Sequence, residues 1–323
     1  MPDNHMWGVN YLGKYGIVAD ILPFSKYKLL RKISLMYFTG DLDQQVRLAH
    51  RVLKTKYDYI YTAQQNTIWL MTYVRKIWKR IPPIIAVLHS VPHFKNKFFR
   101  KMLFAHINKI DKIICISKKN YDLLIGEAGF SSRKVWYSEE GVDLNFYKPK
   151  KVNRDIILSV GKTLRDYRTL CEAMIGVDKK CVIVCDKKDV RGIDAKAYPN
   201  VEFVTTYLSY PDLFALYDRA IAVVVPLQKI HRKYGITSVL EGLAMARPVI
   251  MTKNEYIDVG LEEYNCGLFC GKEDVDSMKR HLLFLIKNVN IADDMGSRGR
   301  KLIEERYDSA VFADKLAQAI TKN

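Results

Sequence analysis

The chain has 323 residues, a length typical of two domains rather than of one compact core. Apolar residues make up 49% and charged residues 27%, which excludes an intrinsically disordered chain. The longest uncharged stretch, residues 59–74, has 16 residues and includes several polar ones, so we expect no membrane-spanning helix. Six scattered cysteines, and no basic segment followed by an apolar leader, favour a reducing, cytoplasmic location.

Positive charge is concentrated in the first half of the chain. The formal net charge is +17, and residues 1–150 contribute +14 of it, from 25 Lys and Arg against 11 Asp and Glu. Residues 151–323 contribute only +3. This asymmetry excludes a uniformly basic chromatin-type protein and indicates a local anionic partner, either nucleic acid or a membrane surface.

In chain order, the first half contains short apolar runs that we interpret as strands separated by charged helices. These candidate strands cover residues 16–22, 57–62, 83–89, 112–117 and 134–139. The run Phe146-Tyr-Lys-Pro149, followed by two lysines, is typical of a surface connection. We therefore predict a first domain over residues 1–150.

The second half alternates strands and helices more regularly. The candidate strands are residues 155–160, 181–185, 201–204, 220–227 and 248–252, and the candidate helices are 167–175, 210–217, 238–245, 276–287, 293–306 and 309–320. Nearly continuous apolar runs indicate strands buried on both faces, as in a doubly wound parallel α/β domain. We predict a second domain over residues 151–305 and a C-terminal helix, residues 306–323, placed to pack back on the first domain. Two such domains predict a ligand cleft at the carboxyl ends of their strands.

The most specific segment is Tyr234-Gly-Ile-Thr-Ser-Val-Leu-Glu-Gly-Leu-Ala-Met-Ala-Arg-Pro-Val-Ile250. A basic loop precedes a helix that opens at Thr237–Ser238, so free backbone N–H groups and the helix dipole predict a site for a diphosphate. Glu241, one turn into the helix, could accept hydrogen bonds from both hydroxyls of a ribose. The alternative is a capping box, Ser238-x-x-Glu241, in which the carboxylate satisfies a backbone N–H. The local residues leave both interpretations open.

This segment resembles the donor-site motif of the family 4 (group 1) glycosyltransferases of the GT-B fold. Further segments resemble the same family, in the expected order: Ile157–Lys162 with Arg165–Arg168, Asp111–Ser117, Gly141–Pro149, Gly267–Phe269 and Gly296–Tyr307. The resemblance covers most of residues 83–320. It implies an α/β protein with two doubly wound, Rossmann-like domains facing across a cleft.

The resemblance also implies an activity. A metal-independent, retaining hexosyltransferase-like enzyme would move a sugar from a nucleotide-diphosphate sugar, with UDP-sugars slightly favoured. The acceptor would be a glycan or a lipid-linked molecule, in cell-surface polysaccharide or glycoconjugate biosynthesis. Cations and helix N–H groups would stabilise the charge of the departing nucleoside diphosphate, and no cofactor is expected.

Residue roles follow from the resemblance by position. The catalytic candidates are His89, Lys162 and Glu241. The diphosphate-binding candidates are Gly161, Lys162, Arg165, Arg168, Arg232, Lys233, Gly235, Thr237 and Ser238. The nucleoside-binding candidates are Thr206, Tyr207 and Leu208, with Glu241 on the ribose. His89 ends a strand, where the alternative is a simple polar end-cap, and His93 is a weaker candidate.

Three features depart from the family pattern. Lys233 occupies a position where the family often has an acid that contacts the sugar, which indicates either a cation serving the diphosphate or altered chemistry. Glu140 stands where Asn is usual. The family's first strand and glycine-rich loop are not recognisable, because residues 7–16 resemble the helix that follows them.

We predict no metal site. The pairs Cys181/Cys185 and Cys266/Cys270 are interpreted as core cysteines rather than as zinc ligands. The patterns Asp41-Leu-Asp43 and Asp274-Val-Asp276 are interpreted as solvated loop acids.

The basic first half contains cations interleaved with large apolar residues. This candidate membrane or acceptor face comprises Lys76, Trp78, Lys79, Arg80, Lys97, Arg100 and Lys101. Such segments suit an anionic membrane surface, so we expect a cytoplasmic protein peripheral to the inner face of the membrane. The alternative is a solvated helix face with Trp78 and Phe104 in the core.

Three functions are therefore considered. The leading one is a glycosyltransferase that binds a nucleotide-sugar, a glycan or lipid-linked acceptor and an anionic membrane, but no nucleic acid. The second is a catalytically degenerate GT-B protein that binds sugar nucleotide or partner proteins without turnover. The third is a basic α/β protein that binds nucleic acid, although no recognised nucleic-acid motif is present.

Overall fold

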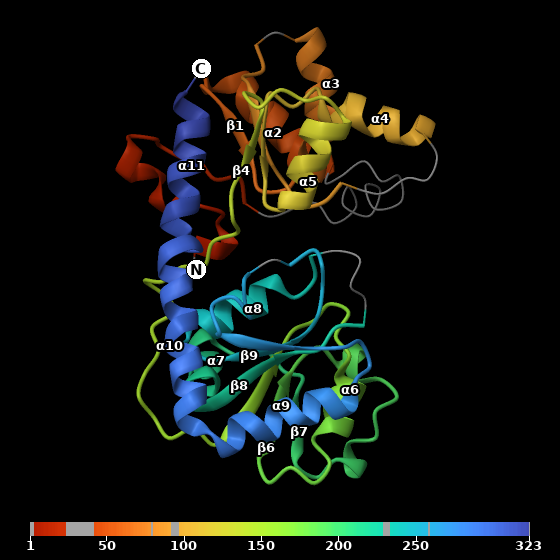
Figure 1. The fold of residues 1–323 in the computed structure, drawn as a ribbon. Helices are drawn as coiled ribbons and strands as arrows, with labels where there is room; N and C mark the ends of the chain where they lie inside the picture. Colours follow the sequence, from red (N-terminus) through yellow and green to blue (C-terminus); the bar gives the residue numbers. More distant parts are fainter. Residues whose placement is uncertain are drawn as a thin grey trace. The chain divides into compact units, whose positions relative to one another are not determined.

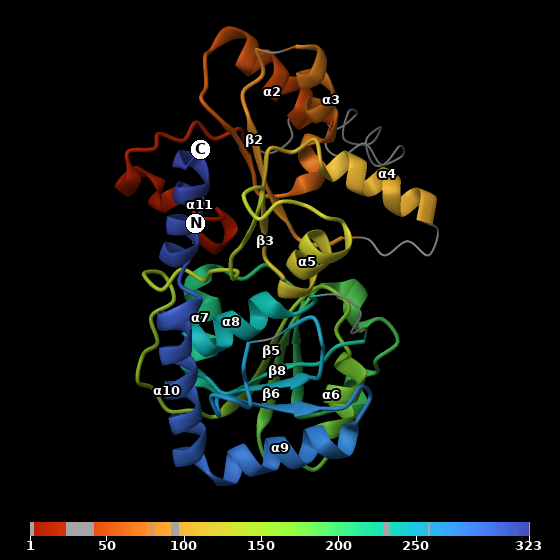
Figure 2. The same ribbon diagram turned by 45° about the horizontal axis from the view of Figure 1, so that its top comes forward.

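The structure, a computed structural model, describes residues 3–23, 42–78, 80–91, 97–228, 233–257 and 259–322 (Figures 1 and 2). The chain divides into two compact units, Asp3–Glu140 with Ala310–Asn323, and Gly141–Ser309. It therefore passes between the units twice. The predicted boundary at residue 150 lies inside the second unit, and most of the C-terminal helix belongs to the first.

The first unit contains a four-stranded parallel sheet in the order β1-β2-β3-β4. Its strands are β1 (Ile60–Thr62), β2 (Ile84–Leu88), β3 (Lys112–Cys115) and β4 (Val135–Tyr137). Each lies within a predicted apolar run. All five residues of β2 are buried, as the absence of polar alternation in this run predicts.

Helices cover both faces of this sheet. They are the 3₁₀ segments η1 (Asp3–His5), η2 (Val9–Tyr15) and η3 (Gln65–Ile68), the helices α2 (Leu42–Lys54), α3 (Trp69–Ile77), α4 (Lys97–Ile107), α5 (Lys118–Asp122) and α11 (Ser309–Thr321), and the π-helical turn η4 (Leu123–Glu127). One core joins the sheet to α2, α3 and α4, and the other joins it to η2 and α11. No helix within the described ranges is both long and apolar enough to cross a membrane.

The prediction of a strand over residues 16–22 is wrong. This segment is irregular and, among the described residues, pairs with no strand. Val18 is 97% exposed and Ile21 52% exposed, so its apolar side chains do not supply a buried sheet face.

The second unit contains a six-stranded parallel sheet in the order β10-β9-β8-β5-β6-β7. Its strands are β5 (Ile156–Val160), β6 (Lys180–Val184), β7 (Val201–Val204), β8 (Ala220–Val225), β9 (Val249–Thr252) and β10 (Gly267–Cys270). The first five correspond to predicted strands, whereas β10 was not predicted as one. The central strand β8 is buried along its whole length.

Two layers of helices enclose this sheet (Figure 2). The elements are α6 (Tyr167–Ala173), η5 (Lys187–Val190), η6 (Ala195–Ala197), α7 (Tyr210–Arg219), α8 (Ile236–Ala244), α9 (Val275–Lys287) and α10 (Val289–Arg306). One core packs α7, α8 and the end of α10 on one face of the sheet, and the other packs α6 and α9 on the opposite face.

The strand order of the second unit positions a ligand site. The sheet grows from β5 through β6 to β7 on one side, and through β8 to β9 and β10 on the other. The loops after β5 and β8 therefore leave the same sheet edge on either side of a topological switch point. In open α/β sheets this is where ligands bind.

Candidate nucleotide-binding site

The loops that follow β5 and β8 are joined by their backbones at this switch point. The Asp166 N–H donates to the Pro226 carbonyl over 3.1 Å, and the Gln228 N–H donates to the Leu164 carbonyl over 3.0 Å. Between these bonds, Arg165 and Leu227 form an antiparallel bridge. The two loops therefore form one rigid platform that places Arg165.

Arg165 is a buried cation, only 6% exposed. Its Nη1 donates to the Thr163 carbonyl and its Nη2 to Ser238 Oγ, both over 2.9 Å, whereas within the described chain its Nε has no hydrogen-bond partner. Burial lowers the pKa of Arg165, yet a guanidinium stays charged at neutral pH. A Cβ on Gly161 would lie 2.4 Å from Arg165 Nε, so the guanidinium needs glycine there.

Helix α8 begins beside this guanidinium. Gly235 is its N-cap, with a left-handed φ of 91° that favours glycine and with no side-chain cap. Ser238 lies inside the first turn, where its Oγ accepts from Arg165 and donates to the Val160 carbonyl over 2.8 Å. The exposed Thr237 precedes it. The capping-box interpretation is therefore wrong, because Ser238 is not the cap.

Glu241 follows one turn later and is 7% exposed. Its Oε1 accepts a hydrogen bond from the Tyr147 phenol over 2.6 Å, and its Oε2 accepts one from the Tyr217 phenol over 3.0 Å. Phenol donors offset the cost of burying a carboxylate. A guanidinium, a helix N-terminus and a carboxylate thus lie within two turns of α8.

The other predicted diphosphate ligands make contacts of their own near the platform, lie on the approach to α8, or lie outside the described residues. Lys162 is exposed, and its ammonium lies 3.3 Å from Asp186 Oδ1 in the loop after β6. The exposed Arg168 donates to the Gly192 carbonyl over 2.9 Å. Lys233 is half-buried at the start of the segment that leads into α8, and Arg232 lies outside the described residues.

The predicted nucleoside-binding residues follow β7, at the same sheet edge as the platform. Thr206 and Tyr207 are exposed, Tyr207 by 87%, while Leu208 packs against the core beneath α7 and α8. Because β6 separates β7 from β5, these residues flank the platform rather than form part of it.

His89 lies at the carboxyl end of β2 in the first unit. Its ring Nε2 is 2.7 Å from the Ala63 carbonyl, so Nε2 carries a proton and donates. The Trp7 indole packs edge-on against the imidazole, with 4.7 Å between ring centroids. The ring therefore has a fixed orientation. His93 lies outside the described residues.

The candidate membrane face includes α3 and α4, which lie side by side. The His106 ring stacks on Trp69 and lies 3.1 Å from the Tyr73 hydroxyl. Trp78 is 43% exposed, whereas Phe104 packs against the core, so only the second of these aromatics fits the alternative of a solvated helix. Exposed cations of this face are Arg80 and Lys101, and Arg100 lies 3.5 Å from Glu127. Lys79 and the side chains of Lys76 and Lys97 lie outside the described residues.

The cysteines and acids were also considered as metal ligands. All six cysteines are buried, and burial raises the pKa of the Cys185, Cys266 and Cys270 thiols to about 11, which agrees with their interpretation as core residues. Asp274 caps α9, and Asp43 is buried against Arg47, so the expectation of a solvated acid is wrong for Asp43. Over the described ranges, no three or more His, Cys, Asp or Glu residues are grouped to hold a metal.

Comparisons with solved structures define the class of fold. A glycosyltransferase from Rickettsia africae matches with a TM-score of 0.70 and 16% identity over 98% of this chain and 88% of that one. Anabaena Alr3699/HepE, solved with UDP-glucose, matches with a TM-score of 0.71 and 13% identity over 97% and 88%. Sucrose-phosphate synthase from Thermosynechococcus elongatus matches with a TM-score of 0.66 and 18% identity over 93% and 80%. The two Rossmann-like α/β units are those of the GT-B fold.

Family models give the narrower assignment. A model described as Glycosyltransferase Family 4 matches residues 24–146, and one described as Glycosyl transferases group 1 matches residues 154–288. The chain therefore belongs to the family 4/group 1 glycosyltransferases. No curated protein sequence matches it.

The partners of Glu241 were not predicted from the sequence. Tyr147 lies in the predicted connection, and Tyr217 ends a predicted helix, but neither was assigned a role. The sequence shows only that each of these two positions is a tyrosine, and nothing in the neighbouring residues links either of them to Glu241.

Proposed function

We propose that this protein transfers a sugar from a nucleoside-diphosphate sugar, with UDP-sugars slightly favoured, and with retention of configuration. The observation that carries the proposal is that Arg165 bonds to Ser238 in the first turn of α8 and Glu241 lies in the next turn, at the switch point of the sheet. The helix N-terminus and the guanidinium suit a diphosphate, and the carboxylate suits a ribose. The UDP-glucose complex of Anabaena HepE, which has this fold, supports the donor class.

The proposed reaction needs positive charge where the leaving group departs. Cleavage of the sugar–phosphate bond leaves a nucleoside diphosphate, whose negative charge Arg165 and the N-terminal N–H groups of α8 would stabilise. Lys162 is exposed, and its ion pair among the described residues is a surface contact to Asp186, so it can turn toward the phosphates at small cost. We propose that these groups perform the role that a metal ion performs in other transferases.

His89 is proposed to contact the transferred sugar. Because its Nε2–H is directed to the Ala63 carbonyl, Nδ1 is the ring nitrogen left for a sugar hydroxyl. Trp7 holds the ring in this orientation. His89 would therefore orient the sugar rather than supply a proton.

We propose that the acceptor is a glycan or lipid-linked molecule of the cell surface, reached from the cytoplasmic face of the membrane. Helix α3 supports this, because its outward face carries Leu70, Tyr73 and Ile77 at 43, 48 and 90% exposure, followed by Trp78. This apolar stripe is exposed, although Lys109 and His106 contact Tyr73, and an exposed apolar stripe suits a membrane interface. Beside α4, a cavity of about 540 Å³ combines Phe104 and Phe130 with cations. It is lined by Arg100, Lys101 and Lys134 among others.

The donor proposal is tested by calorimetric titration of UDP, GDP, dTDP and ADP into the wild type and Glu241→Ala. One nucleoside diphosphate should bind the wild type, and the variant should lose roughly 1–3 kcal/mol, the range for a buried hydrogen bond to a charged group. Equal affinity in Glu241→Ala would show that the ribose assignment is wrong.

The membrane proposal is tested by co-sedimentation with vesicles of neutral or anionic lipid. Binding should require anionic lipid and weaken with salt. Ile77→Glu should reduce it several-fold, because the charge enters the apolar stripe. Val18→Glu is the matched control, since Val18 is 97% exposed in the same unit. Equal losses in both variants, or undiminished binding in Ile77→Glu, would contradict the assignment of this face.

A further inference from the structure

Both oxygens of the Glu241 carboxylate accept hydrogen bonds from buried phenols. Tyr147 donates to Oε1 and Tyr217 to Oε2, over 2.6 and 3.0 Å. Both tyrosines are 0% exposed, whereas Glu241 retains 7%. The phenols therefore contact the carboxylate without being accessible to a ligand. Burial, and then the charge of Glu241, raise the pKa of Tyr217 well above its usual value, so this phenol stays a donor.

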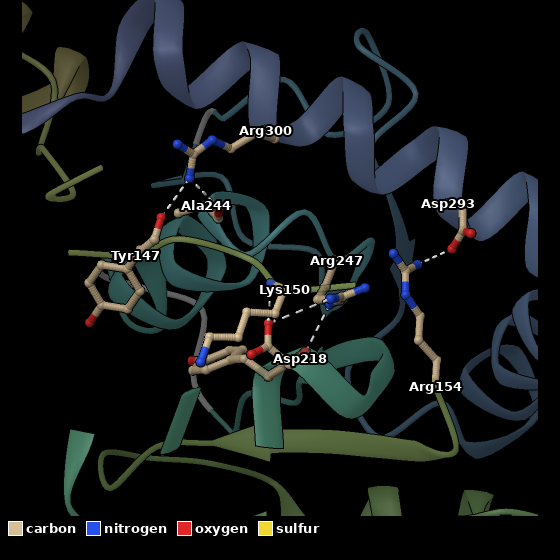
Figure 3. Close-up of polar contacts among 9 residues, drawn as sticks. Tyr147, Lys150, Arg154, Asp218, Ala244, Arg247, Asp293 and Arg300 are labelled. Carbon is tan, nitrogen blue, oxygen red and sulfur yellow. Dashed lines mark hydrogen bonds and ion pairs between the residues drawn. The ribbon is translucent and has the colours of Figure 1, made fainter. Parts of the chain in front are cut away.

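Each tyrosine is in turn anchored by an arginine that bonds to its backbone carbonyl. Arg300, on α10, donates from Nη1 to the carbonyls of Tyr147 and Ala244, both over 2.7 Å (Figure 3). Ala244 is the last residue of α8, the helix that carries Glu241. The Arg300 guanidinium therefore joins the backbone of Tyr147 to α8, the helix that carries Glu241.

The second anchor is Arg247, which is 1% exposed. Its Nε donates to the Tyr217 carbonyl over 2.8 Å, and its Nη2 lies 3.9 Å from Asp218 Oδ1. The same Asp218 oxygen accepts from the Lys150 N–H over 2.7 Å (Figure 3). Burial lowers the pKa of Arg247 to about 10, so it remains a cation at neutral pH. The connection that carries Tyr147 is therefore bound to α7 as well as to α8.

The two phenol hydrogen bonds determine which acceptor positions on the Glu241 carboxylate a ligand could use. A carboxylate offers about four lone-pair directions, two on each oxygen. The phenols take one on each oxygen, and because a carboxylate oxygen accepts more than one hydrogen bond, they do not by themselves exclude a ligand. Two adjacent acceptors on a carboxylate whose oxygens are each held by a phenol match the vicinal hydroxyls of a ribose.

We propose that Tyr147 and Tyr217 are positioning residues that orient Glu241 for the 2′- and 3′-hydroxyls of the donor ribose. This inference rests on the proposed function, because it takes Glu241 as the ribose ligand. It assigns the specificity for ribonucleotides over 2′-deoxyribonucleotides to residues that do not touch the nucleotide. A purely structural role for the phenols would instead affect stability and leave this specificity unchanged.

The experiment compares UDP with 2′-deoxy-UDP by calorimetry, in the wild type, Tyr147→Phe, Tyr217→Phe and Glu241→Gln. The wild type should prefer UDP by about tenfold or more, the effect of one hydrogen bond to a charged group. Each phenylalanine variant keeps the ring but removes the donor, and should lose most of that preference. Tyr198→Phe, which removes a phenol beside the opposite core, is the matched control and should keep it.

The outcomes separate this inference from the function on which it rests. If Glu241→Gln loses the preference and both phenylalanine variants keep it, the positioning role is wrong and the donor site stands. If the wild type binds both nucleotides equally, or neither, the ribose assignment itself fails. Two independent variants are used because thermal unfolding could show one of them to be misfolded, and the folded one then decides.

Discussion

At the scale of single residues, the candidate site depends on close packing between Gly161 and Arg165. A side chain at position 161 would enter the space that the Arg165 guanidinium fills. The same cation reaches Ser238 Oγ, which in turn donates to the carbonyl of the last β5 residue, Val160. Loss of this packing therefore displaces the cation from the N-terminus of α8.

Gly161→Ala tests this packing. The new methyl group would lie 2.4 Å from Arg165 Nε, a separation that real Cβ atoms do not tolerate, so the side chain must move. We expect the affinity for UDP to fall about tenfold or more, since a charge-assisted contact is lost. Gly126→Ala is the matched control, because nothing described lies within 4 Å of the position that its new methyl group would take. Equal affinity in both variants would contradict the dependence on Gly161.

The sequence predicted part of this site. Two short segments contain the predicted residues of the site, and their glycines, cations and helix start are typical of anion binding. These residues are Gly161, Arg165, Ser238 and Glu241. Tyr147 could not be placed, because it is 94 residues from Glu241 and only the fold brings them together. The exposed pairing of Lys162 with Asp186 likewise depends on β5 lying beside β6.

At the scale of elements, α11 completes the first unit although it is encoded at the end of the chain. Phe312 and Leu316 pack with Ile85 and Val87 of β2 on one face of the sheet. The Lys112 ammonium donates to the carbonyls of Ala319 and Lys322 at the end of the same helix. Helix α11 therefore supplies one of the two covers of this sheet.

Leu316→Ala should consequently destabilise the first unit. Leu316 is 0% exposed, and removing a buried leucine side chain costs about 2–5 kcal/mol of unfolding free energy. The neighbouring half-buried Lys315→Ala should cost much less. Urea unfolding of both variants measures this, and equal stabilities would show that α11 is not part of this core.

Helices α3 and α4 meet through His106, which makes their packing sensitive to acid. Burial, and then the charge of Lys109, lower the pKa of His106 from 6.5 to about 4. Between these values the unfolded state binds a proton that the folded state does not, so stability falls as the pH falls from about 7 to 4. The loss attributable to His106 is up to roughly 3 kcal/mol.

His106→Phe isolates this contribution. The variant keeps a ring against Trp69 but cannot titrate, so its unfolding free energy should fall less than that of the wild type over the same pH range. The measurement is a series of urea unfolding curves at each pH. Parallel pH profiles would contradict a neutral, buried His106.

Element prediction succeeded where an apolar run was long enough to span a buried strand. Ala220–Val225 has no polar residue, and the structure places it at the centre of the sheet as β8. Residues 16–22 are also mostly apolar but include Asp20, which accepts hydrogen bonds from Arg51 and Tyr57. Among the described residues this segment pairs with no strand, and Val18 and Ile21 lie at the surface. Strand β10 was missed, since Gly267–Cys270 begins with glycine, which weakens a strand.

At the scale of the whole molecule, the two units differ in chemistry. The first half carries most of the net charge of +17 and exposes the apolar stripe of α3, whereas the second holds the candidate nucleotide site. This division fits a transferase whose donor is soluble and anionic and whose acceptor lies at an anionic surface. A nucleic-acid-binding function would leave the platform around Arg165 unexplained.

The most direct test of sugar transfer is the release of UDP from a panel of UDP-sugars, with and without added acceptor glycans or lipids, and in the presence of EDTA. We predict that the wild type releases UDP from at least one of them without added metal, and that Arg165→Met lowers the rate at least about tenfold. Binding of UDP without release from any UDP-sugar would contradict the proposed activity and favour a degenerate GT-B protein that binds nucleotide without turnover.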